Sequence, residues 1–259
     1  MAQDRQKNRR LYFNELAETS NKYFVPYISQ FKEIKRHMNI LEVGCGDGGN
    51  LLPFSRMGCN TIGIDISECR IKDAILFFKE NNAKGEFILS DIFKMKEVKT
   101  KFDLIICHDV FEHIENKQMF LQNIKNMLTT GGVIFMSFPA WQMPFGGHQQ
   151  ICRNKIISHF PFIHLLHRSL YKLILRTANE TEGCIKELLN IKRTKITIEY
   201  FERLLKEEEI TILDKQLYFI NPHYEIKFGL QPKKLYPFIA QIPYIRDFCT
   251  TSCFYILKN

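Results

Sequence analysis

Short apolar runs alternate with stretches of helical periodicity between residues 39 and 137. The runs have the length and composition of buried strands, and they lie at 39–43, 61–64, 87–89, 102–107 and 133–137. Between them, helices are expected at 50–56, after an N-cap at Ser67, and before a stop at Gly131 and Gly132. Strands that alternate with helices in this way predict a parallel sheet covered by helices.

The rest of the chain surrounds this repeat. Residues 11–37 are predicted to be helical with a break at Pro26, and residues 140–195 interrupt the strand–helix rhythm. Thr197 is expected to cap a further helix, and the runs 210–219 and 252–257 are expected to be antiparallel neighbours. The predicted fold is α/β: a doubly wound, mostly parallel seven-stranded sheet with helices on both faces and an antiparallel last strand. We expect one domain, made of an N-terminal helical cap (1–38), a core (39–139), an insertion (140–195) and a sheet-closing part (196–259).

Composition supports a globular protein and excludes several other classes. The 259 residues are 45% hydrophobic and 25% charged, which excludes disordered and collagen-like chains. No apolar run approaches the ~20 residues that cross a bilayer, and no secretory apolar region follows the polar N-terminus. The eight cysteines are scattered singly, so we expect free thiols and a cytoplasmic protein.

The net charge of +8 is unevenly distributed. Residues 1–150 contain 19 Lys and Arg against 17 Asp and Glu, whereas residues 151–259 contain 17 against 11. The basic excess therefore lies in the second part of the chain, where it favours anionic substrates, a membrane surface or nucleic acid.

The strongest chemical signal is a glycine-rich turn directly after the first predicted strand. Glu42 lies in that strand, and Gly44, Gly46 and Gly48 follow at alternate positions. Glycines allow a tight turn whose backbone can approach a ligand closely, and the helix after the turn offers free N–H groups to an anion.

Acidic residues follow the next strands. Asp65 ends the second predicted strand, 21 residues after Gly44, where a carboxylate can accept hydrogen bonds from ribose hydroxyls. Asp91 follows the third strand, and His108 and Asp109 follow the fourth. Since the carboxyl ends of parallel strands share one edge of the sheet, these groups are expected to form one ligand site there.

With these motifs, residues 39–139 and the elements after 196 resemble the class I S-adenosylmethionine-dependent methyltransferases. In motif style the chain is most similar to the small-molecule methyltransferases of ubiquinone and menaquinone biosynthesis. The resemblance implies methyl transfer from S-adenosylmethionine, with S-adenosylhomocysteine as product, to a small acceptor. It places the three glycines around the methionine moiety, Glu42 at its ammonium group, Asp65 at the ribose, Asp91 and Ile92 at the adenine, and His108 near the sulfur. Cys45, Ile66 and Ser90 complete the implied cofactor-binding set.

Candidate catalytic residues are His148 and Asp109. His148 follows the fifth strand, where it can remove a proton from an acceptor hydroxyl. The run Asp109-x-x-Glu112-His113 is similar to the E-x-x-E-H run that can hold a divalent metal in quinone-biosynthesis enzymes. We nevertheless favour the interpretation in which Glu112 and His113 only begin the next helix, with no metal bound.

The insertion points to the acceptor. Residues 151–176 contain five Lys and Arg, no acid and many interleaved apolar residues. We favour a lid helix packed on the core, and the alternatives are a cover over an apolar acceptor and a peripheral membrane contact. Transfer to oxygen or carbon of an apolar or lipid-like small molecule is the leading hypothesis. The alternatives are an NAD-type oxidoreductase, because Gly44-x-Gly46-x-x-Gly49 with Asp65 also fits a dinucleotide fingerprint, and a non-catalytic S-adenosylmethionine-binding module. Nucleic acid is not favoured as the acceptor, since no base-flipping motif follows the fourth strand.

Overall fold

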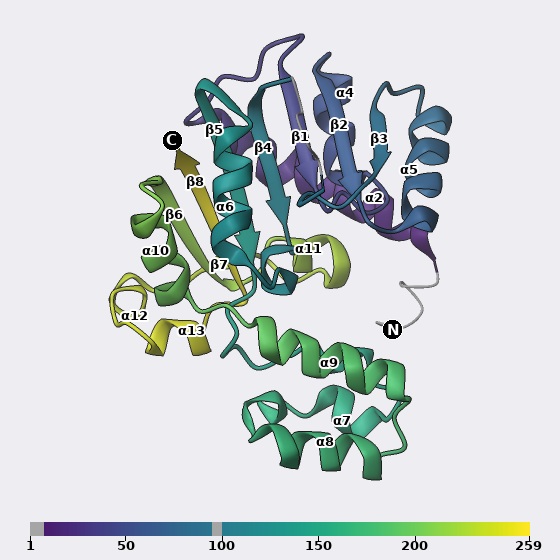
Figure 1. The fold of residues 1–259 in the computed structure, drawn as a ribbon, viewed down its shortest axis with the longest axis vertical. Coiled ribbons are helices and arrows are strands. Elements are labelled where there is room, and N and C mark those ends of the chain that lie inside the picture. The colour runs from purple at the N-terminus through teal and green to yellow at the C-terminus, as the bar shows by residue number, and fades with distance from the viewer. Residues whose placement is uncertain (1–7, 95–99) are drawn as a thin grey trace.

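The computed structural model describes residues 8–94 and 100–259, and its centre is one twisted sheet (Figure 1). Residues 1–7 of the predicted N-terminal cap lie outside the described part of the chain. The strands are β1 Asn39–Val43, β2 Asn60–Asp65, β3 Glu86–Leu89, β4 Phe102–His108, β5 Leu128–Phe138, β6 Thr211–Ile220, β7 Lys233–Lys234 and β8 Ser252–Lys258. All five strands predicted between residues 39 and 137 are present.

The sheet has the order β3-β2-β1-β4-β5-β8-β6-β7. Strands β1 to β5 pair in parallel, and β8 lies antiparallel between β5 and β6. The doubly wound, mostly parallel fold is confirmed, as is the antiparallel pairing of β6 with β8. The predicted strand number of seven was too low by one, because the two-residue strand β7 pairs with the edge of β6.

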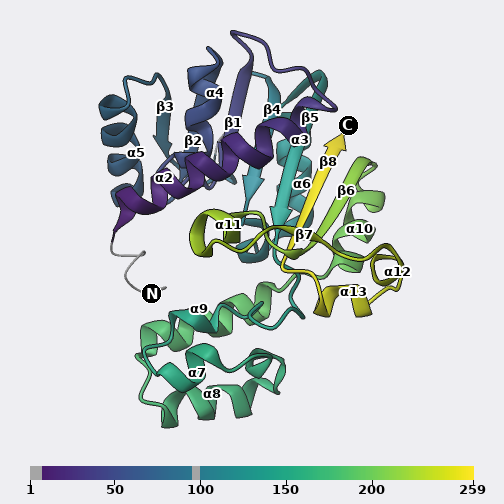
Figure 2. The same ribbon diagram turned by 180° about the vertical axis from the view of Figure 1, so that it is seen from behind.

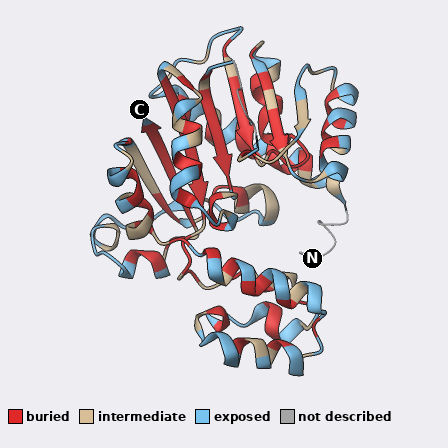
Figure 3. Ribbon diagram, in the orientation of Figure 1, coloured by how far each residue is buried: buried red, intermediate tan, exposed pale blue. Residues whose placement is uncertain are grey.

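Helices cover both faces because alternate residues of each strand point to opposite sides. Ile40, Leu104 and Ile106 belong to one apolar cluster, and Leu41, Ile105 and Cys107 belong to the other. The first face is covered by α2 Arg9–Thr19, the π-helix η1 Ser20–Phe24, α3 Val25–Ser29, η2 Gly49–Leu51, α4 Leu52–Arg56 and α5 Glu68–Glu80 (Figure 2). The second face is covered by η3 Phe111–His113, α6 Lys117–Asn126 and α10 Ile198–Glu207. Figure 3 shows the central strands buried almost throughout.

The insertion is a helical unit with an apolar cluster of its own. It contains η4 Gln149–Ile151, α7 Lys155–His159, η5 Ile163–Leu165, α8 Arg168–Thr177 and α9 Glu182–Thr194. In Figure 1 it lies below the sheet, on the side to which the arrows of β1, β2 and β4 point. Three short helices complete the second part of the chain: α11 His223–Phe228, α12 Pro237–Ala240 and α13 Ile245–Phe248.

Three local predictions need correction. Helix α6 ends at Asn126 rather than at Gly131 and Gly132, because β5 already begins at Leu128 and both glycines lie inside it. Ser67 occupies the N-cap position of α5, but its side chain makes no capping hydrogen bond. The N-terminal helical stretch continues through Pro26: the π-helix η1 leads directly into α3, and the proline lies in the first turn of α3.

Two further observations bear on the expected environment. None of the eight cysteines, all of which lie in the described ranges, forms a disulfide. Among residues 8–94 and 100–259, no helix is both long enough and apolar enough to cross a membrane.

Candidate functional site

The glycine turn lies at the carboxyl ends of β1 and β2. The backbone N–H groups of Gly44 and Cys45 both donate to the carbonyl of Ile64, at 2.8 and 3.0 Å, which closes the turn against β2. Gly44 has φ +70°, and a Cβ built there would lie 2.3 Å from Cγ2 of Val110. Only glycine therefore fits, and its absent side chain lets the loop after β4 pack directly on the turn.

Asp65 joins the end of β2 to this turn. Its Oδ2 accepts from the backbone N–H of Gly46 at 2.9 Å, and its Oδ1 accepts from that of Ser67 at 2.8 Å. The carboxylate is thus held in one orientation, with further lone pairs on both oxygens. Next to it, the Ile66 side chain is 78% exposed, which leaves an apolar surface open at the same edge.

Glu42 is a buried acid of the site whose carboxyl is only partly hydrogen-bonded. The residue is 1% exposed, its Oε1 accepts from Asn50 Nδ2 at 2.7 Å, and its Oε2 makes no hydrogen bond to any described residue. Burial raises the pKa of this carboxyl to about 8, and the Asn50 hydrogen bond opposes the shift.

Two more buried acceptors lie in the same turn. Asn50 Oδ1 and Asp47 Oδ1 make no hydrogen bond within the described ranges, although Arg9 Nη1 lies 3.8 Å from Asp47 Oδ1. Buried acceptor atoms normally have donors, so these oxygens and Glu42 Oε2 mark a place for a ligand that carries N–H or O–H groups.

The third and fourth strands bring the other predicted residues to the same edge. Ser90 N–H donates to the Asp65 carbonyl at 3.0 Å, and Asp91 Oδ1 accepts from Phe93 N–H at 3.0 Å. Ile92 is 5% exposed and belongs to the apolar core of the sheet. The structure therefore gathers the predicted cofactor residues of β1, β2 and β3 on one edge, with Ile92 below the surface.

His108 ends β4 as a buried residue. Its Nδ1 lies 3.1 Å from Ser137 Oγ on β5, and its Nε2 lies 3.5 Å from Asp109 Oδ2. Asp109 itself is exposed and has φ +52°, so the chain turns sharply after the strand.

Of the two candidate catalytic residues, His148 belongs to a second group of side chains, with Glu112 and His113, and Asp109 does not. His148 Nε2 is 3.9 Å and His113 Nε2 is 3.8 Å from Glu112 Oε1, and the two imidazole rings are 5.2 Å apart. Both carboxylate oxygens of Glu112 are buried and make no hydrogen bond to described residues. The three ligand atoms lie within 4.8 Å of one another, so this group, without Asp109, is chemically able to hold a divalent cation.

Charge and burial set the protonation of this group. Burial, followed by the repulsion from Asp109, raises the pKa of Glu112 well above its usual range. Burial lowers the pKa of His148, against an opposing effect of Asp109, so its imidazole is neutral at neutral pH and able to accept a proton.

Hydrogen bonds of Lys117 and Thr194 connect the insertion to the site. The buried ammonium of Lys117 donates to the carbonyls of Phe111, at 3.0 Å, and Thr194, at 2.5 Å. Thr194 Oγ1 in turn donates to the carbonyl of Glu112 at 2.6 Å. The end of α9 is therefore tied directly to the segment that carries Glu112.

Sequence reasoning missed the residues that the N-terminal helix contributes. Tyr12 lies edge-on to His223, with ring centroids 6.1 Å apart, and burial followed by Asp109 raises its pKa. Tyr224 on α11 is also near Asp109, and burial raises its pKa to about 12. No local motif marks these tyrosines, because they reach the edge of the sheet only through packing of distant segments.

Comparisons with known proteins agree with the fold and the motifs. Residues 34–207, more than half of the chain, match a family model described as a methyltransferase domain. The ubiquinone biosynthesis O-methyltransferase of Rickettsia canadensis is 34% identical over 109 residues, which are 42% of this chain and 45% of that protein. The match thus spans less than half of the length of this curated relative.

Solved structures show the same fold over nearly the whole chain. The plantazolicin methyltransferase BpumL, in complex with a triazolic desmethylPZN analogue and S-adenosylhomocysteine, has a TM-score of 0.57 at 18% identity, and the match covers 99% of this chain and 89% of that one. An S-adenosylmethionine-dependent methyltransferase from Clostridium acetobutylicum has a TM-score of 0.58 at 16% identity, covering 93% and 91%.

The chain belongs to the class I S-adenosylmethionine-dependent methyltransferases. The family predicted from the glycine turn and the strand-end acids is confirmed, and the dinucleotide-dependent oxidoreductase is set aside.

The buried carboxyl of Glu42 makes a testable contribution to stability. Its pKa is about 8 in the folded protein and 4.5 when unperturbed, so its contribution to stability is fully present below about pH 4.5 and is lost as the pH rises through about 8. We expect the ligand-free wild type to lose stability relative to Glu42→Gln as the pH rises from about 5 to about 8. Urea denaturation at several pH values measures this difference, with exposed Glu86→Gln as the control. A wild-type-to-variant difference that does not change with pH would contradict the assignment.

Proposed function

We propose that this chain binds S-adenosylmethionine at the carboxyl edge of β1 to β4 and directs its methyl group to a small, apolar acceptor. The observation that carries the proposal is the set of buried acceptor oxygens around the glycine turn that lack a donor, Glu42 Oε2 foremost. An amino acid ammonium group is the kind of partner that such oxygens require, since it brings both N–H donors and a positive charge.

The residues at this edge fit the three parts of S-adenosylmethionine, which are the methionine moiety, the ribose and the adenine. Glu42 and the turn at Gly44 would hold the methionine moiety, Asp65 would accept from the ribose hydroxyls, and Asp91 with the exposed Ile66 would face the adenine. When bound, S-adenosylmethionine supplies a methyl group that its sulfonium already activates, so the protein has chiefly to align the acceptor and exclude water.

We assign proton removal from the acceptor to His148. Its imidazole is neutral at neutral pH because burial lowers its pKa, and one nitrogen lies 3.9 Å from the Glu112 carboxyl. The imidazolium that forms when the proton is accepted would favour ionisation of the neighbouring Glu112 carboxyl, and the resulting negative charge would stabilise it. The negative charge of Asp109 favours the same charged form of His148.

The insertion supplies the argument for an apolar acceptor. It is tied to the site through Thr194, and its outer surface exposes large apolar residues: Ile156, Phe160, Phe162, Leu166, Leu170 and Leu173. The name of the Rickettsia relative gives that protein a role in ubiquinone biosynthesis, whose lipid-like substrate class fits such a surface. For this chain we propose only the same class of acceptor, an apolar small molecule with a hydroxyl or an activated carbon.

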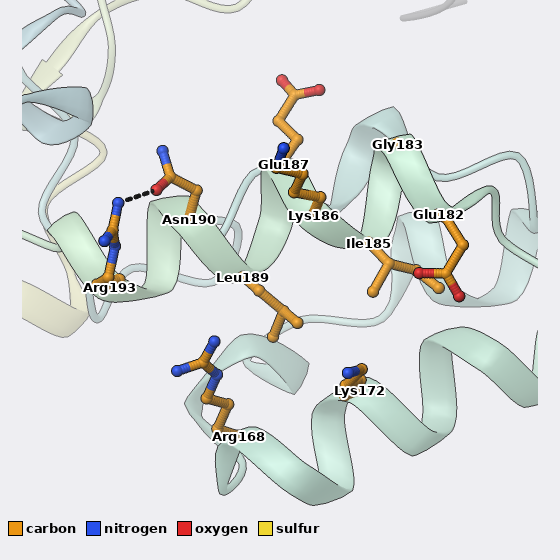
Figure 4. Close-up of a pocket in the computed structure, with 10 residues that line it drawn as sticks. All are labelled: Arg168, Lys172, Glu182, Gly183, Ile185, Lys186, Glu187, Leu189, Asn190 and Arg193. Atoms are coloured by element: carbon orange, nitrogen blue, oxygen red, sulfur yellow. Dashed lines mark hydrogen bonds between the residues drawn. The ribbon is translucent and has the colours of Figure 1, made fainter.

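A groove between α8 and α9 adds positive charge beside the apolar surface. It has a volume of about 1000 Å³ and is lined by four cations, Arg168, Lys172, Lys186 and Arg193, and by two acids, Glu182 and Glu187. Figure 4 shows Arg168 and Lys172 on one helix and Leu189 with Arg193 on the other. Cations next to exposed Leu170 and Leu173 are typical of a peripheral membrane contact, which would bring the insertion to a membrane-dissolved acceptor.

Asp65→Ala tests the cofactor site. Loss of the carboxylate removes charge-assisted hydrogen bonds to the ribose, and we expect S-adenosylmethionine and S-adenosylhomocysteine to bind about 2–3 kcal/mol more weakly. Calorimetric titration measures both affinities, and circular dichroism of Asp65→Ala checks that the fold survives the loss of the bonds to Gly46 and Ser67. Exposed Glu207→Ala on α10 is the control. Unchanged affinity in Asp65→Ala would refute the ribose assignment.

His148→Ala tests the base. With an acceptor hydroxyl in place, we expect kcat to fall by about 100- to 10,000-fold while S-adenosylmethionine affinity stays the same. His159→Ala, an exposed histidine of α7, should leave kcat unchanged. We also expect added Mg²⁺ to leave the wild-type rate unaltered, because His148 and Glu112 are assigned to proton transfer and not to a metal. A rate that depends on added Mg²⁺ would overturn that assignment.

Vesicle flotation tests the membrane contact. We expect the wild type to float with vesicles of phosphatidylglycerol and phosphatidylcholine, and less so in high salt, because screening weakens the attraction of α8 cations to anionic lipid. The double variant Lys172→Glu/Leu173→Asp should stay in the soluble fraction, whereas Lys206→Glu on α10 should float as the wild type does. Equal flotation of wild type and double variant would show that α8 is not the contact.

A further inference from the structure

The insertion holds a second group of metal-ligating side chains, away from the site described above. Cys152 follows η4, Glu180 lies in the turn between α8 and α9, and Cys184 lies in the first turn of α9. One ligand atom from each lies within 4.8 Å of the other two. Cys152 is 1% exposed, Glu180 is 8% exposed, and Cys184 is half-buried.

The backbone around the group already holds two of the three side chains in position. Glu180 Oε1 accepts from the N–H of Asn154 at 2.8 Å, and Oε2 accepts from the N–H of Arg153 at 3.1 Å. The carboxylate therefore spans from the α8–α9 turn to the residues directly after Cys152. Thr181 Oγ1 caps α9 by accepting from the N–H of Cys184 at 3.2 Å, which fixes the helical turn that presents the third side chain.

A buried phenol beside the thiols remains unsatisfied. Tyr171 is 0% exposed, and its hydroxyl makes no hydrogen bond to any residue that the structure describes. After burial, the largest influences that raise its pKa are Cys152 and Cys184. Among described residues, the surroundings of the two thiols thus contain a polar atom that still lacks a partner, such as a metal-bound water would provide.

We propose that Cys152, Glu180 and Cys184 form a zinc site in the insertion, with a water molecule as the fourth ligand. Two sulfurs and one carboxylate are a donor set that zinc accepts in tetrahedral geometry, and the sulfurs exclude the oxygen-preferring cations Mg²⁺ and Ca²⁺. Binding converts both thiols to thiolates and releases their two protons, so the occupied site carries a net charge of −1.

The proposed zinc ion would stabilise the fold of the insertion. The apolar cluster of the insertion has eight buried members and is separate from both clusters of the sheet. Small clusters of this size supply little stability by themselves, and natural proteins often add a metal. Zinc at this position joins η4, the α8–α9 turn and α9, and so fixes the helices that carry the basic groove.

Cobalt substitution gives a readout that identifies the ligands. We expect purified wild type to bind one Zn²⁺ or Co²⁺ per chain and to show the thiolate-to-cobalt charge-transfer absorption. This absorption separates the site from Glu112, His113 and His148, which contain no sulfur. In Cys184→Ser the absorption should disappear and Zn²⁺ affinity should fall by at least about 100-fold, while Cys69→Ser, which removes an exposed thiol elsewhere, should match the wild type.

Glu180→Gln keeps the shape of the side chain and tests the carboxylate when the cysteine variants are unstable. We expect it to weaken Zn²⁺ binding by about 10- to 100-fold, whereas exposed Glu182→Gln should not. Three results would overturn the proposal: no thiolate absorption in wild type with Co²⁺, equal Zn²⁺ affinity in wild type and Cys184→Ser, or a Cys152–Cys184 disulfide in freshly purified protein. Zinc binding is measured without methyl transfer, so this test stands apart from the proposed function.

Discussion

Because β1 to β5 run in one direction, the carboxyl ends of all five strands lie at the same edge of the sheet. Beyond the end of a strand, backbone N–H and C=O groups no longer pair with a neighbouring strand. These groups and the side chains next to them need hydrogen-bond partners outside the sheet. In this chain, Asp65 satisfies the glycine turn and His108 contacts Ser137, whereas Glu42 and Glu112 keep carboxylate oxygens without donors. The common direction of the strands therefore brings these residues together at one edge. The acids without donors favour a ligand that carries N–H or O–H groups.

In our proposal the two unsatisfied acids have different roles. Glu42 lies at the glycine turn, where a cationic ligand would relieve the cost of burying its charge, and Glu112 lies 3.9 Å from His148, whose charged form it would stabilise. Thr194 and Lys117 connect the second acid to the insertion. The insertion also carries the basic groove. In our proposal it holds a zinc ion as well and would connect acceptor recognition to the chemistry.

The sequence predicts features that depend on neighbouring residues. The strand β1, the glycine turn and the position of Asp65 follow from local spacing, and Thr197 caps α10 through Tyr200 N–H as expected. Features that depend on packing between distant segments cannot be predicted from such local patterns. Tyr12 reaches the edge from the N-terminal helix, and His148 meets Glu112 across 36 positions of chain. The two-residue strand β7 has no apolar pattern, because both of its residues are exposed lysines.

Proton release on cofactor binding tests the central claim most directly, namely that the unsatisfied Glu42 carboxyl is the partner of the cofactor ammonium group. Titration of S-adenosylhomocysteine at about pH 7, in two buffers with different ionisation enthalpies, measures the protons exchanged on binding. Glu42 has a pKa of about 8 when the site is empty, so pairing with a cation should ionise it and release close to one proton. The account predicts that release in the wild type and its loss in Glu42→Gln. The same proton exchange in both proteins would contradict it.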